Sequence, residues 1–523
     1  MSKYLSLPPK VTEEIMDKAV AEFTKIVGKR NIYITKEEMA PYTKVMMATK
    51  IEDLMPSIAM APKSVEEIQA ILEVCNKYKV PVWAFSTGKN LGYGSTSPAR
   101  TGTALLDLGR MNKILEVNEK LGYALVEPGV TYQDLYDYLK ERNIPLWLSF
   151  SAPSAIAGPL GNTADRGVGY TPYGEHFMFQ CGMEVVLADG QVLRTGMGGI
   201  ENSNSWQVFK WGYGPYLDGI FTQSNYGIIT KMGIWLMPEP PVYKPFSISF
   251  PKEEDVVDIV DKLLPLRLAN IIPNSFTIGS TVYEAPIVAN RGDYHTGPGH
   301  ITDEELAKLR KEHKLGAWTV FAALYGDEVT VEHNWKIVQS VFADRPDVTY
   351  HTEEDMGHDP IFRYRASLMK GEPNLQEFSL YNWKGGGGSM WFAPVAPATG
   401  DHTLKQKNLA KKILNKYGLD YVGEFIVGMR DLHHIVDVVY DRTNEEERIN
   451  AKAAFSELIQ EFAKEGYGMY RTNTGHMDEV GATFGFAMQD TFHKIKKALD
   501  PNNIIAPGKS GIDLNTWRVQ EKS

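Results

Sequence analysis

Residues 62–94 read PKSVEEIQAILEVCNKYKVPVWAFSTGKNLGYG, and this stretch decides the fold class. Ser64, with Glu67 three residues later and apolar residues at helical spacing after it, predicts a capped helix start. Residues 81–87 are apolar and β-prone, so they predict a strand. Residues 88–94 are rich in glycine and predict a loop. The stretch therefore predicts a helix, a strand and a glycine loop in succession.

The same alternation continues outward from this stretch. Thr131 with Asp134 predicts another helix start. Further strands are predicted at 104–108, 123–126 and 183–187. Interleaved strands and helices over residues 50–235 indicate layered α/β or α+β architecture.

A cluster of prolines predicts a domain boundary. Pro238, Pro240 and Pro241 cannot continue a strand or a helix. The region after them mixes a predicted strand with predicted helices, at 246–250, 304–313, 403–414 and 453–465. A chain of 523 residues exceeds the size at which one core keeps growing. We therefore expect two domains of an α+β fold.

Composition excludes several functional classes. A formal net charge of -10 disfavours binding to nucleic acid, which requires clustered Lys and Arg. No segment approaches the ~20 apolar residues of a membrane span, and the N-terminus lacks the apolar core of a signal peptide. We expect a soluble chain, and export with a partner that carries a signal stays open. Cys75 and Cys181 are expected to be buried thiols.

Glycine-bearing loops recur in the first half of the chain. They lie at 86–94, 127–130, 149–163 and 221–228. Glycines at such spacing let several backbone N–H groups face one concavity, which suits phosphate oxygens. Neither a Walker loop nor a Rossmann fingerprint fits, so plain turns are the alternative.

Tyr381 precedes four consecutive glycines, Gly385–Gly388, that lie between aromatic residues. Linkers combine glycine with small polar residues, so this run is not a linker. Two interpretations stay open: a sharp surface turn, or a close approach of the chain to a large flat ligand.

Two further clusters carry titratable side chains. Tyr470 and Arg471 are adjacent on a predicted strand, so their side chains converge only if the strand is bulged or irregular. If Tyr93 joins them, two phenols and an Arg form a pocket that favours the anion of a bound phenol. A surface Arg with a packed Tyr is the alternative. His433 and Asp437, with Glu424 upstream, are candidate acid–base groups that share a face if they share a helix. A metal site is disfavoured, because adjacent histidines cannot both point inward.

Taken together, these motifs resemble the vanillyl-alcohol oxidase family of FAD enzymes, and within it the flavoproteins of the para-cresol methylhydroxylase type. The resemblance covers essentially the whole chain. It is carried by residues 86–94 (STGKNLGYG), 148–158 (LSFSAPSAIAG), 161–176 (GNTADRGVGYTPYGEH), 381–394 (YNWKGGGGSMWFAP) and 502–511 (NNIIAPGKSG).

The resemblance implies a two-domain fold of the vanillyl-alcohol oxidase type. Residues 1–240 and 467–523 would form the FAD-binding domain, and residues 241–466 an inserted cap domain. Residues implied to line FAD are Thr87, Gly88, Asn90, Gly92, Gly94, Pro128, Gly129, Pro153, Gly158, Gly161, Asn162, Gly227, Ile228, Trp391 and Lys509.

Tyr381 stands where the methylhydroxylases attach the flavin covalently through a tyrosine ether. The oxidases instead use a histidine at the position of Ser389, and an aspartate at the position of Ser149. Both departures favour a dehydrogenase over an oxygen-using oxidase. A covalent link raises the reduction potential of a flavin and makes it a better hydride acceptor.

The resemblance also implies a reaction and its residues. Tyr93, Tyr470 and Arg471 would hold a 4-alkylphenol as phenolate while hydride leaves its para-alkyl carbon for FAD. Water would then add to the resulting quinone methide, with Asp437 or Glu424 as base. Glu377 and His433 match other polar groups of this family's active site.

The resulting expectation is a hydroxylating 4-alkylphenol dehydrogenase. Its electrons would pass to a c-type cytochrome subunit that carries the haem, and a flavoprotein homodimer is expected in an α2β2 complex. The location would be the bacterial periplasm after co-export and the cytoplasm otherwise. The alternatives are a phenol oxidase that makes hydrogen peroxide and a flavin-binding scaffold without turnover. Four lysines of one helix either dock an acidic partner or form a solvated face: Lys405, Lys407, Lys411 and Lys412.

Overall fold

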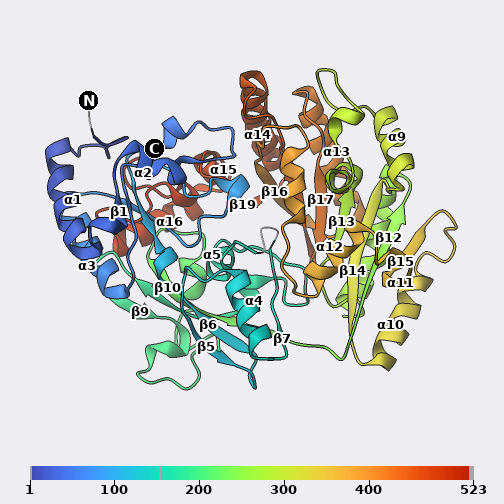
Figure 1. Ribbon diagram of the computed structural model, residues 1–523, viewed down its shortest axis with the longest axis horizontal. Coiled ribbons are helices and arrows are strands. Elements are labelled where there is room, and N and C mark those ends of the chain that lie inside the picture. The colour runs from blue at the N-terminus through green and yellow to red at the C-terminus, as the bar shows by residue number, and fades with distance from the viewer. Residues whose placement is uncertain (1–2, 152–154, 518–523) are drawn as a thin grey trace.

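The computed structural model describes residues 3–151 and 155–517 and has two lobes (Figure 1). The first lobe holds a four-stranded sheet in the order β1-β2-β4-β3 and a five-stranded sheet in the order β5-β6-β10-β8-β9. Their bounds are β1 Ile32–Tyr33, β2 Ala59–Met60, β3 Val82–Phe85, β4 Ala104–Asp107, β5 Ile114–Asn118, β6 Tyr123–Val126, β8 Gln180–Val186, β9 Val192–Arg194 and β10 Ile228–Trp235. Two short strands, β7 Leu146–Trp147 and β11 Met237–Pro238, pair separately.

Helices pack around these two sheets. They are α1 Glu13–Val27, α2 Lys36–Met39, α3 Val65–Tyr78, α4 Tyr132–Glu141, α5 Pro159–Ala164, α6 Asp218–Phe221, α15 Met477–Ala482 and α16 Phe486–Leu499. Figure 1 shows the red C-terminal helices α15 and α16 beside the blue N-terminal elements. Ile505 pairs with Val82 of β3, so the end of the chain completes the first lobe.

The second lobe is built on an eight-stranded sheet in the order β15-β12-β14-β13-β17-β18-β16-β19. Its strands are β12 Val242–Phe250, β13 Phe276–Ser280, β14 Trp318–Gly326, β15 Thr349–Thr352, β16 Trp391–Pro397, β17 Gly423–Val427, β18 Asp431–Asp437 and β19 Met469–Arg471. Its helices are α7 Val256–Leu268, α8 Thr281–Glu284, α9 Asp303–His313, α10 Glu328–Ser340, α11 Glu353–Met356, α12 Pro360–Met369, α13 Gly400–Lys416 and α14 Glu445–Lys464, with the 3-10 turn η11 Gln376–Asn382. The α+β fold expected from the sequence is confirmed. The exact domain boundaries stay a prediction.

The helix starts predicted from the sequence are present in the structure, and their capping contacts are largely those expected. Ser64 Oγ accepts from the Glu67 N–H at 3.3 Å and starts α3. The Glu67 carboxylate accepts from the Lys63 N–H at 2.8 Å instead of returning to Ser64. Thr131 and Asp134 form the complete capping box at the start of α4. Cys75 and Cys181 are buried free thiols, as expected.

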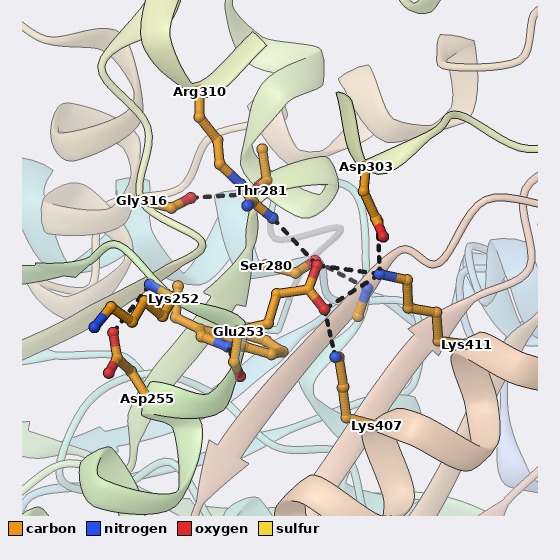
Figure 2. A network of polar contacts seen from close by, with 12 residues as sticks. Lys252, Glu253, Asp255, Ser280, Thr281, Asp303, Arg310, Gly316, Lys407 and Lys411 are labelled. Atoms are coloured by element: carbon orange, nitrogen blue, oxygen red, sulfur yellow. Dashed lines mark hydrogen bonds and ion pairs between the residues drawn. The ribbon is translucent and has the colours of Figure 1, made fainter. Parts of the chain in front are cut away.

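Most lysines of helix α13 form ion pairs within the chain. Lys407, Lys411 and Arg310 converge on Glu253 (Figure 2), with Lys411 Nζ 3.1 Å and Arg310 Nη2 3.4 Å from Oε1. Lys405 pairs with Glu465 at 2.6 Å on the helix surface. These contacts tie α13, α9 and the segment before α7 together, so they favour a structural role over a docking surface.

The carboxylate of Glu253 provides a test of this network. Burial would raise its pKa, but Lys407 and Lys411 lower it from 4.5 to about 2. Because the folded-state pKa lies below the unfolded one, the stabilisation is complete above pH 4.5 and is lost as the pH falls toward 2. We expect Glu253→Gln to lower the unfolding free energy by about 2 kcal/mol at pH 7.

Thermal unfolding followed by circular dichroism at several pH values measures this effect. Glu254→Gln, at the exposed neighbouring position, is the matched control and should leave the unfolding midpoint unchanged. A gap between Glu253→Gln and the unmutated protein that stays constant from pH 7 to pH 3 would contradict the assignment.

Candidate functional site

A cavity of about 680 Å³ is lined by residues of both lobes. Seventeen of the site residues expected from the sequence line it: Thr87, Gly88, Asn90, Tyr93, Pro128, Gly158, Gly161, Asn162, Gly227, Ile228, Glu377, Tyr381, Trp391, Glu424, Tyr470, Arg471 and Lys509. The glycine-bearing loops of the first half thus converge on one space. Pro153 lies outside the described residues.

Three expected glycines do not line the cavity but hold its loops in place. A Cβ on Gly92 would lie 2.2 Å from the Trp391 ring, and one on Gly129 would lie 2.6 Å from the Gly109 carbonyl oxygen. Gly94 has a φ of +113°, and a Cβ there would lie 2.4 Å from Thr474 Oγ1. These glycines therefore permit close packing of the loops against their neighbours.

The four-glycine run does not line the cavity either. Gly385, Gly386 and Gly387 have φ values of +80°, +62° and +67°, which only glycine adopts freely in succession. Arg442 Nε donates to the Gly386 carbonyl at 2.8 Å, and Gly388 bridges Tyr440. The run forms a turn against residues 440–442, so of the two interpretations the structure supports the sharp turn.

The turn leads from Tyr381 to Trp391, and both side chains line the cavity. Their rings meet edge to face with centroids 6.4 Å apart, and the Tyr381 ring also stacks on Phe378. Burial, followed by the nearby carboxyl groups of Asp437 and Glu377, raises the pKa of Tyr381 well above its ordinary value. Tyr381 is therefore a neutral phenol at the cavity wall at neutral pH.

Tyr93, Tyr470 and Arg471 come together as the sequence predicted for an irregular strand. The register between β16 and β19 shifts at Ala393 and Pro394, and Pro394 has no N–H to donate. The Arg471 guanidinium carbon lies 4.0 Å from the Tyr93 ring centroid and 5.6 Å from that of Tyr470. The bulge thus turns neighbouring side chains of β19 toward one pocket.

The electrostatics of this pocket favour a bound anion. Burial opposes the charge of Arg471, but the phenols of Tyr470 and Tyr93 raise its pKa above the ordinary value. Burial raises the pKa of Tyr93, although Arg471 partly offsets this effect. At neutral pH the pocket therefore offers a cation beside a neutral phenol that can donate a hydrogen bond.

A buried cluster of carboxyl groups lines another part of the cavity wall. Glu377 Oε1 accepts from Tyr283 Oη at 2.5 Å and Oε2 from Tyr170 Oη at 3.4 Å. Burial is the main reason why the pKa of Glu424 rises to about 8 and that of Glu377 also rises. A carboxyl group with a pKa near 8 can hold or release a proton near neutral pH.

The cluster includes residues that the sequence analysis missed. Arg365 Nη2 lies 2.5 Å from Glu424 Oε2 and 2.6 Å from Glu284 Oε1, and all three side chains are buried. The sequence signal for Arg365 was weak, because the exposed Arg363 stands two residues before it, and no motif surrounds Glu284.

Asp437 and His433 are not among the residues that line the cavity. They share a face of strand β18, so the helix considered for them is wrong. Asp437 Oδ1 accepts from Ser389 Oγ at 2.6 Å, and burial raises the pKa of Asp437 well above its ordinary value. The His433 ring stacks on Tyr470 with centroids 4.5 Å apart. His433 therefore supports the ring of Tyr470 by stacking on it.

Ser149 and Lys509 complete the residues singled out in the sequence. Ser149 Oγ is buried without a hydrogen-bond partner among the described residues. Lys509 Nζ lies 3.0 Å from Asp165 Oδ1 at the cavity wall. Among the residues that the structure describes, no three His, Cys, Asp or Glu side chains are grouped to hold a metal ion. Within the same residues, no helix is long and apolar enough to cross a bilayer.

Two family models match this chain. Residues 56–196 match an FAD binding domain, and residues 295–510 match the C-terminal domain of FAD linked oxidases. The chain is 55% identical to the 4-cresol dehydrogenase [hydroxylating] flavoprotein subunit of Pseudomonas putida over 97% of this chain and 98% of that protein.

Solved structures agree with these matches. A crystal structure of p-cresol methylhydroxylase with substrate bound superimposes with a TM-score of 0.97 and 55% identity, covering 98% of this chain and 100% of that one. A 4-ethylphenol oxidase from Gulosibacter chungangensis, in an isoeugenol complex, gives a TM-score of 0.95 and 37% identity, covering 97% and 99%.

The residues that line the cavity fit FAD as a ligand. Several buried polar atoms of its lining residues have no partner among the described residues: Ser151 Oγ, Ser224 Oγ, Arg471 Nε and Thr472 Oγ1. A buried polar atom without a hydrogen-bond partner costs free energy, so these atoms fit a polar ligand bound in the cavity. The lining loops also bring backbone atoms of Gly88, Gly158 and Gly161 to the surface of the cavity.

Proposed function

Because this chain belongs to the family of FAD-linked oxidoreductases that includes the flavoprotein subunit of 4-cresol dehydrogenase [hydroxylating], we propose that it hydroxylates 4-alkylphenols at the para-alkyl carbon. The single observation that carries the proposal is the Arg471 guanidinium beside the Tyr93 phenol in the same cavity as the FAD-lining loops. FAD, when bound, accepts a hydride.

The chain prepares the substrate by binding it as a phenolate. Arg471 supplies a buried positive charge, and Tyr93 supplies a neutral hydroxyl donor. A positive charge beside a bound phenol favours its ionised form. The phenolate oxygen donates electron density into the ring, which promotes loss of hydride from the para-alkyl carbon and leaves a quinone methide.

Hydroxylation then requires a group that takes a proton from water as it adds to the quinone methide. Glu424 and Glu377 line the cavity, whereas Asp437 does not. The pKa of Glu424, about 8, is close to the value at which general acid–base groups work best near neutral pH. We therefore assign proton transfer to Glu424 and Glu377, and a supporting role to Asp437.

We assign covalent attachment of FAD to the phenol oxygen of Tyr381. Its ring lies in the cavity wall, while Ser389 is occupied by its hydrogen bond to Asp437. Trp391 packs on Tyr381 and forms part of the same wall.

Transfer of the electrons to a c-type cytochrome subunit fits the likeness to a flavoprotein subunit of a dehydrogenase. An α2β2 assembly is part of this proposal. The compartment would be the bacterial periplasm if the two proteins are exported together, and the cytoplasm otherwise. The likeness to a 4-ethylphenol oxidase supports a second candidate, an oxidase that forms hydrogen peroxide.

The proposal predicts that anaerobic 4-methylphenol bleaches the oxidised flavin of the purified protein. Arg471→Met removes the cation that stabilises the phenolate, and hydrogen bonds to charged groups contribute about 1.5–3 kcal/mol. We expect the second-order rate constant of flavin reduction to fall about 10- to 100-fold in this variant, measured by stopped-flow absorbance. The methyl ether of 4-methylphenol cannot ionise, so it is the matched control and should reduce neither protein.

Two outcomes of the same experiment would reject the proposal. Absence of bleaching in the unmutated protein would indicate a scaffold without turnover. Rapid reoxidation by air without a cytochrome would indicate the oxidase.

The covalent link predicts that acid precipitation leaves the yellow flavin on the polypeptide. Tyr381→Phe lacks the phenol oxygen, so its flavin should appear in the supernatant. Tyr136→Phe removes a phenol oxygen outside the cavity lining and should behave like the unmutated protein. A colourless pellet from the FAD-loaded unmutated protein would refute the attachment.

A further inference from the structure

A charged pair stands directly behind Glu424, outside the cavity. Arg365 of α12 and Glu284 of α8 each have a side chain only 2% exposed, and neither lines the cavity. A single nitrogen, Arg365 Nη2, lies within 2.6 Å of Glu284 and 2.5 Å of Glu424. One guanidinium nitrogen is thus shared between two carboxyl groups.

The carboxyl groups around this nitrogen outnumber the positive charges that could compensate them. Three carboxyl groups, those of Glu284, Glu377 and Glu424, face the one guanidinium of Arg365. The other titratable groups near the cluster are Asp437 and four tyrosines, Tyr170, Tyr283, Tyr364 and Tyr381. Neutral phenols donate hydrogen bonds but supply no charge. Because an uncompensated buried anion is costly, at least one carboxyl group retains a proton.

Glu284 is held in the position where it competes for Arg365. Tyr364 Oη donates to Glu284 Oε2 at 3.2 Å. On the other side, a Cβ on Gly279 would lie 2.2 Å from Glu284 Oε1, so the backbone of β13 packs tightly against this carboxylate. The side chain is therefore packed against backbone on one side and hydrogen-bonded on the other.

We propose that Glu284 is a positioning residue that makes Glu424 a stronger proton acceptor at the cavity wall, by competing with it for the guanidinium of Arg365. The proposal rests on the hydroxylation proposed above, because that reaction uses a group at this wall that exchanges a proton. Burial, Glu377 and Glu284 raise the pKa of Glu424 while Arg365 lowers it, which agrees with this competition.

Infrared difference spectroscopy of the FAD-loaded protein across pH 5–9 tests the proposal without turnover. The unmutated protein should show a protonated carboxyl band that disappears as the pH rises through about 8, and Glu424→Gln should lack that band. Glu284→Gln keeps the shape and removes the charge, so Arg365 then compensates Glu424 alone. We expect the midpoint of the band to fall by about one to two pH units.

The matched control is Glu332→Gln, which removes the same charge from the exposed surface of α10. It should leave the midpoint unchanged. Glu284→Asp withdraws the carboxylate from Arg365 by one methylene. It should lower the midpoint too, but by less than Glu284→Gln does. This variant therefore provides a test if Glu284→Gln does not fold. An unchanged midpoint in the folded Glu284 variant would overturn the proposal.

Flavin reduction by 4-methylphenol, measured in the same samples, separates this inference from the proposed function. A shifted midpoint in a protein that 4-methylphenol does not reduce would support the role of Glu284 and reject the proposed reaction. Normal reduction with an unshifted midpoint would reject the role of Glu284 alone.

Discussion

The buried guanidinium of Arg471, 4.0 Å from the Tyr93 ring, is the interaction on which the site depends. It joins a glycine loop of the first half of the chain to a strand near its end. The Thr474 N–H donates to the Tyr93 carbonyl at 3.1 Å, and Gln223 Nε2 donates to the Tyr470 carbonyl at 2.7 Å. Three segments far apart in the sequence must therefore fold together before the cation is placed.

The cavity wall combines two opposite electrostatic environments. Around Arg471, a positive charge is buried beside a phenol and favours a bound anion. Around Glu424, two carboxyl groups share one guanidinium and a third, that of Glu377, lies nearby, so a proton is retained in the cluster. A phenolate at the first position and a proton-exchanging carboxyl at the second are the two requirements of hydroxylation at a para-alkyl carbon. Neither environment is visible as a contiguous motif.

The sequence predicted the elements better than it predicted the contacts. Caps such as Thr131–Asp134 and the glycine loops are local signals, and the structure bears them out because local hydrogen bonds determine them. The sequence left two interpretations of the Gly385–Gly388 run open, because its partners at residues 440–442 are distant in sequence. His433 and Asp437 fit helical and strand periodicity equally at a spacing of four. Arg365 and Glu284 escaped notice because only the tertiary fold brings them to Glu424.

The central claim, that the pocket beside Arg471 binds a phenol in its ionised form, has a direct spectroscopic test. A 4-halophenol has no para-alkyl hydrogen to lose, so its complex with the FAD-loaded protein is stable. Its ultraviolet difference spectrum should show the phenolate at a pH well below the pKa of the free phenol, and Arg471→Met should abolish that signal. A bound ligand that keeps the spectrum of the neutral phenol would contradict the account.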